Sequence, residues 1–116
     1  MKEQMLAGVF EGEGKFSLKQ VPVPKIEKPN QVLLKVLCAS ICGTDIQILK
    51  VPPGHPANPG IILGHEYVGE VVDVGSECSF LRPGDWVAVD PNIPCGCCWY
   101  CQKGQHNMCS NMTTLG

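Results

Sequence analysis

The sequence lacks a long apolar run, an excess of charge of either sign and any internal repeat. No stretch approaches the roughly 20 apolar residues that a membrane-spanning helix needs, and the start of the chain has no signal-peptide pattern. The formal net charge of −2 leaves no basic face for nucleic acid. We therefore expect a cytoplasmic protein that binds neither membranes nor nucleic acid.

The sequence also lacks a dinucleotide-binding motif. No G-x-G-x-x-G follows a predicted strand, and no βαβ unit is present to carry one. A chain of 116 residues is long enough for one domain with a core and too short for two ordinary ones. We expect one domain over 1–116 and no Rossmann cofactor domain.

Glycine (13 residues) and proline (10 residues) separate short apolar runs, which is typical of a mainly β domain with many turns. A short helix is expected over 44–50, with Ile46 and Leu49 on one face and Pro52 after its end. Alternation within 32–37 predicts a strand with one face fully buried and the other partly buried. The expected strands cover 5–10, 16–21, 32–39, 67–74 and 86–89.

Cysteine is the residue present in excess, with 8 in the chain. Within 91–111, where apolar periodicity is lost, four cysteines have the spacing C-x2-C-x2-C-x7-C: Cys95, Cys98, Cys101 and Cys109. The short gaps let neighbouring thiolates converge on one ion, and four thiolates suit a closed tetrahedral zinc site. Metal binding would supply the folding energy that this loop lacks.

Other interpretations of these cysteines stay open. The stronger alternative to zinc is an iron–sulfur cluster, because C-x2-C-x2-C also begins the cysteine motif of bacterial ferredoxins. That motif ends with a gap of three residues, a fourth cysteine and a proline, whereas the last gap here has seven residues. Disulfides are disfavoured by strain between close cysteines and by the expected compartment. Cys97 breaks the spacing and is interpreted as a bystander, while Gly96 and Gly104 would ease the tight backbone path.

A second set of metal-ligand residue types lies upstream, at Cys42, His65 and Glu66. Singly, such residues are more often ordinary core or surface groups. As a set they match catalytic zinc, which takes three protein ligands and leaves a position for water or substrate. Thr44 could hydrogen-bond the reacting oxygen and accept its proton, and Asp45 could orient His65. Thr44 and Asp45 could instead cap the following helix, or serve both roles.

Three motifs together resemble the zinc-containing medium-chain alcohol dehydrogenases, the sorbitol- and threonine-dehydrogenase-like enzymes included, over roughly residues 5–116. They are Gly64-His65-Glu66-Tyr67-Val68-Gly69 with Gly75, Cys42-Gly43-Thr44-Asp45, and the four-cysteine loop. The resemblance implies a GroES-like β-barrel, partial in this chain, that presents catalytic zinc to a nicotinamide on a following Rossmann domain.

By this resemblance, Cys42 and His65 are ligands of the catalytic zinc, and Glu66 is either a ligand or a partner that loosens ligation during turnover. Thr44 contacts the reacting hydroxyl. The structural zinc is held by Cys95, Cys98, Cys101 and Cys109.

The reaction that the resemblance implies is hydride transfer from a zinc-bound secondary alcohol to NAD or NADP. Gly43 and the segment 90–94 look more like the polyol and threonine dehydrogenases than the ethanol enzymes, so a small polyol is the first choice of substrate, and threonine and simple secondary alcohols stay open. Many relatives have a proton-relay histidine three residues after the threonine, where this chain has Gln47. Glutamine is not a general base, so a relay must run through water, ribose or another residue.

The resemblance also implies that the sequence stops before the cofactor domain and the remaining catalytic zinc ligand. We therefore expect a truncated domain, inactive alone, whose parent is a homo-oligomer. The competing hypothesis is a non-catalytic zinc module that binds a protein or nucleic acid. That module explains the four cysteines but leaves Cys42, Thr44, His65 and Glu66 without a role, and it needs one zinc ion where the dehydrogenase expects two.

Overall fold

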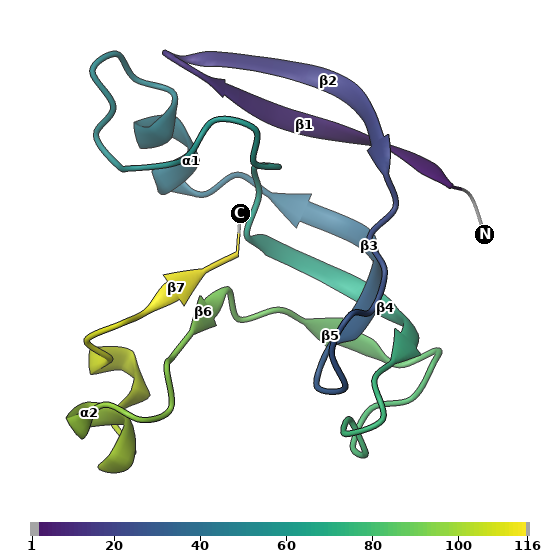
Figure 1. Cartoon of the computed structure of the whole chain (residues 1–116). Coiled ribbons are helices and arrows are strands. Elements are labelled where there is room, and N and C mark those ends of the chain that lie inside the picture. Colours follow the sequence, from purple (N-terminus) through teal and green to yellow (C-terminus); the bar gives the residue numbers. More distant parts are fainter. Residues whose placement is uncertain (1–2, 116) are drawn as a thin grey trace.

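The computed structural model describes residues 3–115 and has three small antiparallel sheets (Figure 1). A hairpin joins β1 (Gln4–Gly12) to β2 (Lys15–Pro22), and a three-stranded sheet has the order β3 (Val32–Ser40), β4 (Glu66–Val74), β5 (Trp86–Ala88). The third sheet pairs β6 (Asn92–Ile93) with β7 (Thr113–Thr114). The helices are short: α1 (Gly43–Ile48), α2 (Trp99–Gln102) and the 3-10 helix η1 (His106–Met108).

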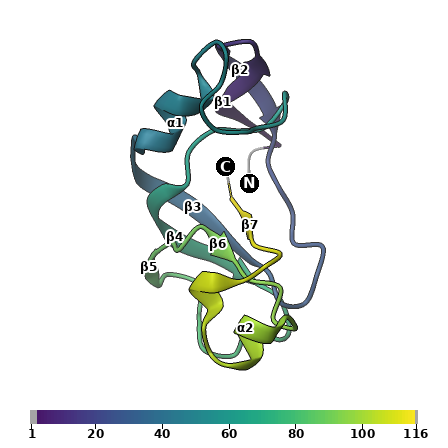
Figure 2. The ribbon, with the colours of Figure 1, turned by 90° about the vertical axis from the view of Figure 1, so that its left-hand side faces the viewer.

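The hairpin and the α2 region lie at opposite ends of the molecule, with the three-stranded sheet between them (Figures 1 and 2). The segment 60–63 runs along β1, where the Phe10 N–H donates to the Ile61 carbonyl at 2.9 Å and the Leu63 N–H to the Gly8 carbonyl at 3.1 Å. This pairing ties the chain between α1 and β4 to the hairpin. Among residues 3–115, none of the helices has the length and apolarity that a membrane crossing requires.

The five expected strands are confirmed, each within two residues of its predicted ends. The segment 91–111, expected as a four-cysteine loop, contains the short elements β6, α2 and η1. These elements have two to four residues, too few to show a period in the sequence. They form where the chain turns to bring the four cysteines together.

The expected helix is confirmed as α1, but its predicted apolar face is not the buried one. Ile46 is 57% exposed, whereas Asp45 and Ile48 are buried. Cys42 is the N-cap and its N–H donates to the Asp45 carboxylate, so the helix begins one residue earlier than predicted and turns Asp45 inward.

The core is small and centres on β1, α1 and β4. Its most buried large side chain is Val71, which is 1% exposed. The expectation of a fully buried face on β3 is wrong, since no residue of β3 is buried and Val36 is 55% exposed. Within the described chain no second layer covers this strand. Register shifts at Leu37 and Val72 also interrupt the alternation between the two faces.

Gly75 closes the sheet against the segment that precedes β3. Its N–H donates to the Gln31 carbonyl at 2.8 Å, and the Glu77 N–H donates to the Pro29 carbonyl at 2.9 Å. A Cβ at Gly75 would overlap the Pro29 carbonyl group, which is backbone and cannot rotate away. This close approach explains why the motif carries glycine at this position.

The first prediction compares Gly75→Ala with Gly43→Ala. We expect Gly75→Ala to lower the free energy of unfolding by about 1–3 kcal/mol, because the added methyl group forces the backbone apart. A Cβ at Gly43 meets nothing within 4 Å, so Gly43→Ala should stabilise the chain by up to about 1 kcal/mol. Urea unfolding followed by circular dichroism measures both, and equal midpoints would contradict the packing argument.

Candidate metal centres

The upstream set of metal-ligand residues meets where β3 ends and β4 begins. Ser40 and Glu66 form the last residue pair of the two strands, Cys42 follows two residues after Ser40, and His65 directly precedes Glu66. Gly64 has φ +112°, a conformation that favours glycine and turns the chain into His65. The ligand atoms of Cys42, His65 and Glu66 all lie within 4.8 Å of one another. The fold therefore brings together the three residues that the sequence singled out.

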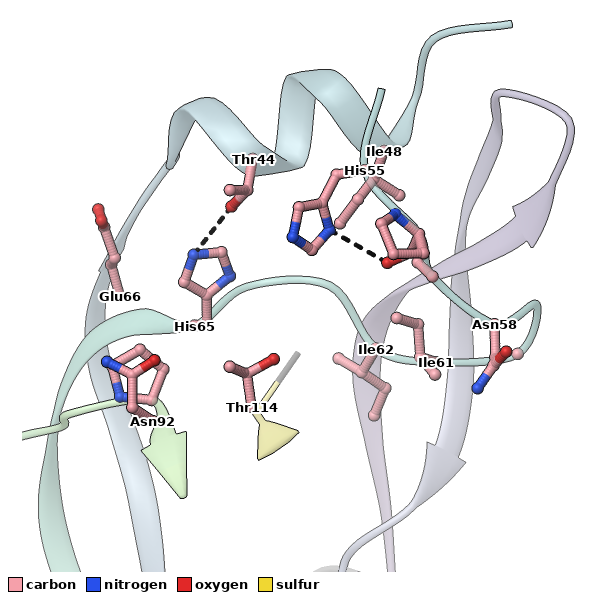
Figure 3. A pocket seen from close by; sticks show the side chains of 14 residues that line it. Thr44, Ile48, His55, Asn58, Ile61, Ile62, His65, Glu66, Asn92 and Thr114 are labelled. Carbon is pink, nitrogen blue, oxygen red and sulfur yellow. Dashed lines mark hydrogen bonds between the residues drawn. The ribbon is translucent and has the colours of Figure 1, made fainter. Parts of the chain in front are cut away.

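Thr44 lies between two of these groups. Its hydroxyl donates to Cys42 Sγ at 3.2 Å and lies 3.1 Å from His65 Nε2, the contact drawn in Figure 3. A single side-chain oxygen thus contacts both the sulfur and the ring nitrogen that would hold a metal.

Asp45 combines the two roles considered for it. Its Oδ2 accepts the Cys42 N–H at 3.0 Å, which is the capping contact. Its Oδ1 is buried, has no hydrogen-bond partner among the described residues and lies 3.7 Å from His65 Nδ1. Metal-binding histidines commonly donate their second ring N–H to a carboxylate. The unpartnered oxygen therefore fits a histidine whose Nε2 faces a cation.

Glu66 is held by a residue that the sequence analysis missed. Ser40 Oγ donates to Glu66 Oε2 at 2.8 Å. This hydrogen bond, helped by one from Cys42, lowers the pKa of the Glu66 carboxyl below its usual value and favours the carboxylate. Ser40 could have been found only from the register of β3 against β4, because nothing in the sequence links residues 40 and 66.

A cavity of about 800 Å³ opens beside these groups, lined by Thr44, His65 and Glu66. Figure 3 shows its remaining walls, which come from α1, from the segment 55–62 and from the ends of β6 and β7. Apolar walls are formed by Ile48, Ile61 and Ile62, and further polar groups come from His55, Asn58, Asn92 and Thr114. Among the described residues, no lysine or arginine lines it.

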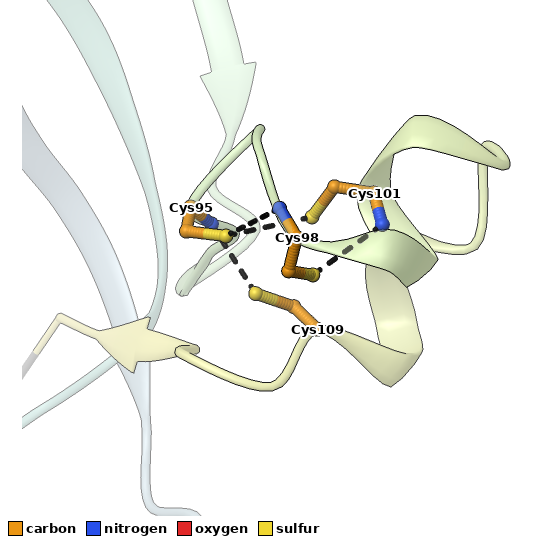
Figure 4. A group of neighbouring side chains, drawn as sticks. All are labelled: Cys95, Cys98, Cys101 and Cys109. Carbon is orange, nitrogen blue, oxygen red and sulfur yellow. Dashed lines mark hydrogen bonds between the residues drawn. The ribbon is translucent and has the colours of Figure 1, made fainter.

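The four-cysteine loop gathers its sulfur atoms within 4.8 Å of one another (Figure 4). Backbone N–H groups point at them: Cys98 donates to Cys95 Sγ at 3.3 Å, and Cys95 donates to Cys109 Sγ at 3.3 Å. Gly96 and Gly104 have φ of +78° and +75°, which confirms the expected role of glycine in the turns. Cys97 lies outside the cluster, as its spacing indicated.

All eight cysteines are free, so the disulfide interpretation is wrong. Backbone N–H groups of Cys97 and Cys98 lower the pKa of the Cys95 thiol to about 6. Burial raises the pKa of the Cys101 thiol to about 12. Backbone N–H donors therefore stabilise a thiolate at Cys95, whereas Cys101 stays a neutral thiol unless a cation binds to the cluster.

One closed set of four thiolates and one Cys–His–carboxylate set open to a cavity, carried on a small antiparallel β domain, define a zinc-type oxidoreductase domain. The chain belongs to the family of the alcohol dehydrogenase GroES-like domain, whose model matches residues 28–116. The resemblance noted in the sequence, including the mainly β GroES-like fold, is thereby confirmed. The family is the one found in zinc-type medium-chain alcohol dehydrogenases.

Among similar proteins, D-altritol 5-dehydrogenase of Agrobacterium fabrum is 41% identical over 92% of this chain and 31% of its own length. L-threonine 3-dehydrogenase of Pyrococcus horikoshii is 40% identical over 100% of this chain and 34% of its own. A protein of Sinorhizobium meliloti described as a zinc-binding dehydrogenase, solved with NADP, has a TM-score of 0.89 and 38% identity, covering 99% of this chain and 33% of that one. The chain spans about a third of the length of the curated relatives it matches.

The second prediction concerns the thiols of the zinc-free chain. At pH 7 iodoacetamide should alkylate Cys95 well before Cys101, because the thiolate is the nucleophile and the pKa is about 6 for Cys95 and about 12 for Cys101. The Cys95 rate should fall as the pH is lowered through about 6, where its thiolate is protonated. Timed alkylation followed by peptide mass spectrometry measures both rates.

Cys38, an exposed cysteine outside the loop, is the internal reference for this experiment. Added zinc should protect Cys95 and leave the labelling of Cys38 unchanged. Equal rates at Cys95 and Cys101 in the zinc-free chain would contradict the difference in thiol pKa that the structure indicates.

Proposed function

We propose that this chain is the catalytic domain of an NAD- or NADP-dependent zinc dehydrogenase that oxidises a secondary alcohol of a small polyol. The observation that carries the proposal is the position of Cys42, His65 and Glu66, whose ligand atoms converge beside the cavity that His65 and Glu66 line. A closed metal site would lack this open space, and catalytic zinc requires it. The dinucleotide would be bound by another part of the whole protein, since the described residues form no βαβ unit.

The residues present fit zinc at both sites. A thiolate, an imidazole and a carboxylate suit its preference for sulfur, nitrogen and oxygen donors, and four thiolates suit a structural ion. In the proposal Cys42, His65 and Glu66 hold the catalytic ion, and the structural ion is held by Cys95, Cys98, Cys101 and Cys109. Zinc, when bound, makes an alcohol oxygen more acidic.

The protein's own groups prepare the substrate for hydride loss. The Thr44 hydroxyl already contacts Cys42 Sγ and His65 Nε2. It would form a hydrogen bond with the reacting hydroxyl of the substrate and would accept its proton and pass it on. Asp45 would fix the orientation of the His65 ring, and the hydrogen bond from Ser40 would hold the Glu66 carboxylate in place. Hydride then leaves the carbinol carbon of the substrate for the nicotinamide ring.

The cavity lining favours a neutral, polyhydroxylated substrate. Asn58, Asn92 and Thr114 offer uncharged donors and acceptors that match hydroxyl groups. An amino acid or a sugar phosphate would call for a permanent cation to pair with its anionic group, and the described lining residues include no lysine or arginine. The similarity to D-altritol 5-dehydrogenase supports the same substrate class.

The third prediction is the zinc content of the chain purified without chelator. We expect about two zinc ions per chain, one lost in Cys42→Ser and the other in Cys98→Ser, because each change removes a thiolate ligand. Cys38→Ser and Cys97→Ser are matched controls that should keep both ions, since neither residue belongs to a ligand set. Elemental analysis measures the content.

Three outcomes of the zinc measurement would count against the assignment. Iron in place of zinc would support the cluster alternative for the four cysteines. A single zinc lost only in Cys98→Ser would show that Cys42, His65 and Glu66 do not hold a metal ion by themselves in this chain. No metal at all would overturn both sites.

The fourth prediction tests the reaction in the whole protein that carries this chain. It should reduce NAD or NADP with a polyol such as sorbitol or altritol, followed by absorbance of the reduced nicotinamide. Thr44→Val should lower kcat on the order of 10²-fold or more, because the hydroxyl that handles the proton is gone. Thr44→Ser keeps a hydroxyl and should stay within a few-fold of the unchanged protein. Equal loss in both variants would show that the hydroxyl of residue 44 has no part in the reaction.

A further inference from the structure

Oxidation of an alcohol by hydride transfer leaves a proton to be removed. The C–H bond breaks with its electron pair, which reduces the oxidised nicotinamide dinucleotide of the proposed function. The O–H bond breaks as the C=O bond forms, and its proton must reach a base that exchanges with solvent. Thr44 can pass this proton on but cannot keep it, because a hydroxyl is a poor base near neutral pH.

Few groups in the cavity can serve as that base. Among the described lining residues the titratable ones are His55, His65 and Glu66. His65 and Glu66 belong to the proposed metal set, which leaves their basic atoms occupied. Gln47 is not a base, and it is not a lining residue. Its side-chain oxygen packs against Gly54, where an added Cβ would overlap it. His55 is the remaining candidate.

The hydrogen bond of His55 determines which of its nitrogens is basic. His55 Nδ1 lies 3.1 Å from the carbonyl oxygen of Pro56. A carbonyl oxygen only accepts, so Nδ1 carries the proton and the neutral ring has its lone pair on Nε2. In Figure 3 the ring lies on the same wall as Thr44, and the nitrogen without a drawn bond is turned to the side where Thr44 and His65 lie.

The segment that carries His55 is attached to α1, the helix that carries Thr44. The Gly54 N–H donates to the Gln47 carbonyl at 2.9 Å, so the residue before His55 is hydrogen-bonded to that helix. His55 itself is exposed at the edge of the cavity. Once protonated at Nε2, the ring keeps its Nδ1–H bond to Pro56 and can release the new proton to water.

We propose that His55 Nε2 accepts the proton that the substrate hydroxyl releases, received through Thr44 or through water in the cavity. This role rests on the proposed dehydrogenase function. It gives the proton an exit through a side chain on the segment after α1, whereas Gln47 on α1 cannot act as a base. The imidazolium formed in each turnover returns to neutral by losing its proton to solvent.

The test in the whole protein compares His55→Gln and His55→Asn with the unchanged enzyme across pH. Both variants should lose kcat on the order of 10²-fold near pH 7, with KM for the polyol changed by less than about threefold, because binding does not require the base. The loss should shrink as the pH rises and hydroxide replaces the base. His106→Asn, a histidine outside the cavity, should keep the kcat and pH profile of the unchanged enzyme.

A hydrogen-bonding role without proton transfer would give a different result. His55→Gln retains a polar side chain that can accept a hydrogen bond, so it would then keep kcat and the pH profile of the unchanged enzyme. That outcome would overturn the proposal while leaving the dehydrogenase function intact. If the unchanged protein oxidises no alcohol with either nicotinamide, the proposed function itself fails and the role of His55 with it.

A second measurement does not depend on turnover. Nitrogen-15 NMR of the imidazole rings in this chain, with assignment by His55→Gln and His106→Asn, reports which nitrogen is protonated. We expect the neutral His55 ring to carry its proton on Nδ1. A proton on Nε2 in the neutral ring would remove the lone pair from the cavity side and overturn the proposal whatever the kinetics show.

Discussion

The antiparallel pairing of β3 with β4 is the constraint on which the upstream metal set depends. The pairing ends at Ser40 and Glu66, so the chain leaving one strand and the chain entering the other start from the same point. Cys42 and His65 lie just beyond that point and need no further contact to be neighbours. Because regular strands hold these ends, the donor atoms are placed more firmly than loops alone would place them. The long connection between the strands then forms α1 and one wall of the cavity.

The two metal centres are supported in different ways. The four-cysteine loop is local, and its backbone N–H groups donate to its own sulfur atoms. Each member of the upstream set instead contacts a separate side chain: Thr44 at Cys42, Asp45 at His65 and Ser40 at Glu66. A closed local site contributes folding energy, whereas an open site with oriented ligands leaves room for chemistry.

The differences between expectation and structure have physical causes. Short apolar runs between turn residues located every long strand, but a sequence pattern does not show whether another layer covers a face of the strand. Among the described residues, no layer covers β3. Bulges at Leu37 and Val72 change which side chains share a face without any signal in composition. Ile46 was assigned to the apolar face of α1, yet a buried carboxylate at Asp45 determined which face turns inward.

The sequence by itself determined the donor types, the zinc loop and the family, because these depend on residues close together along the chain. Two residues separate Cys95, Cys98 and Cys101 from one another, so their sulfur atoms can reach one ion without help from distant segments, and the motif around His65 carries its own glycines. Only the tertiary structure decided that Ser40 supports Glu66 and that His55 and Asn92 share a cavity with Thr44. Those residues come from separate segments, and strand register and loop paths bring them together. Register and loop paths are set by packing across the whole domain, which spacing along the chain does not encode.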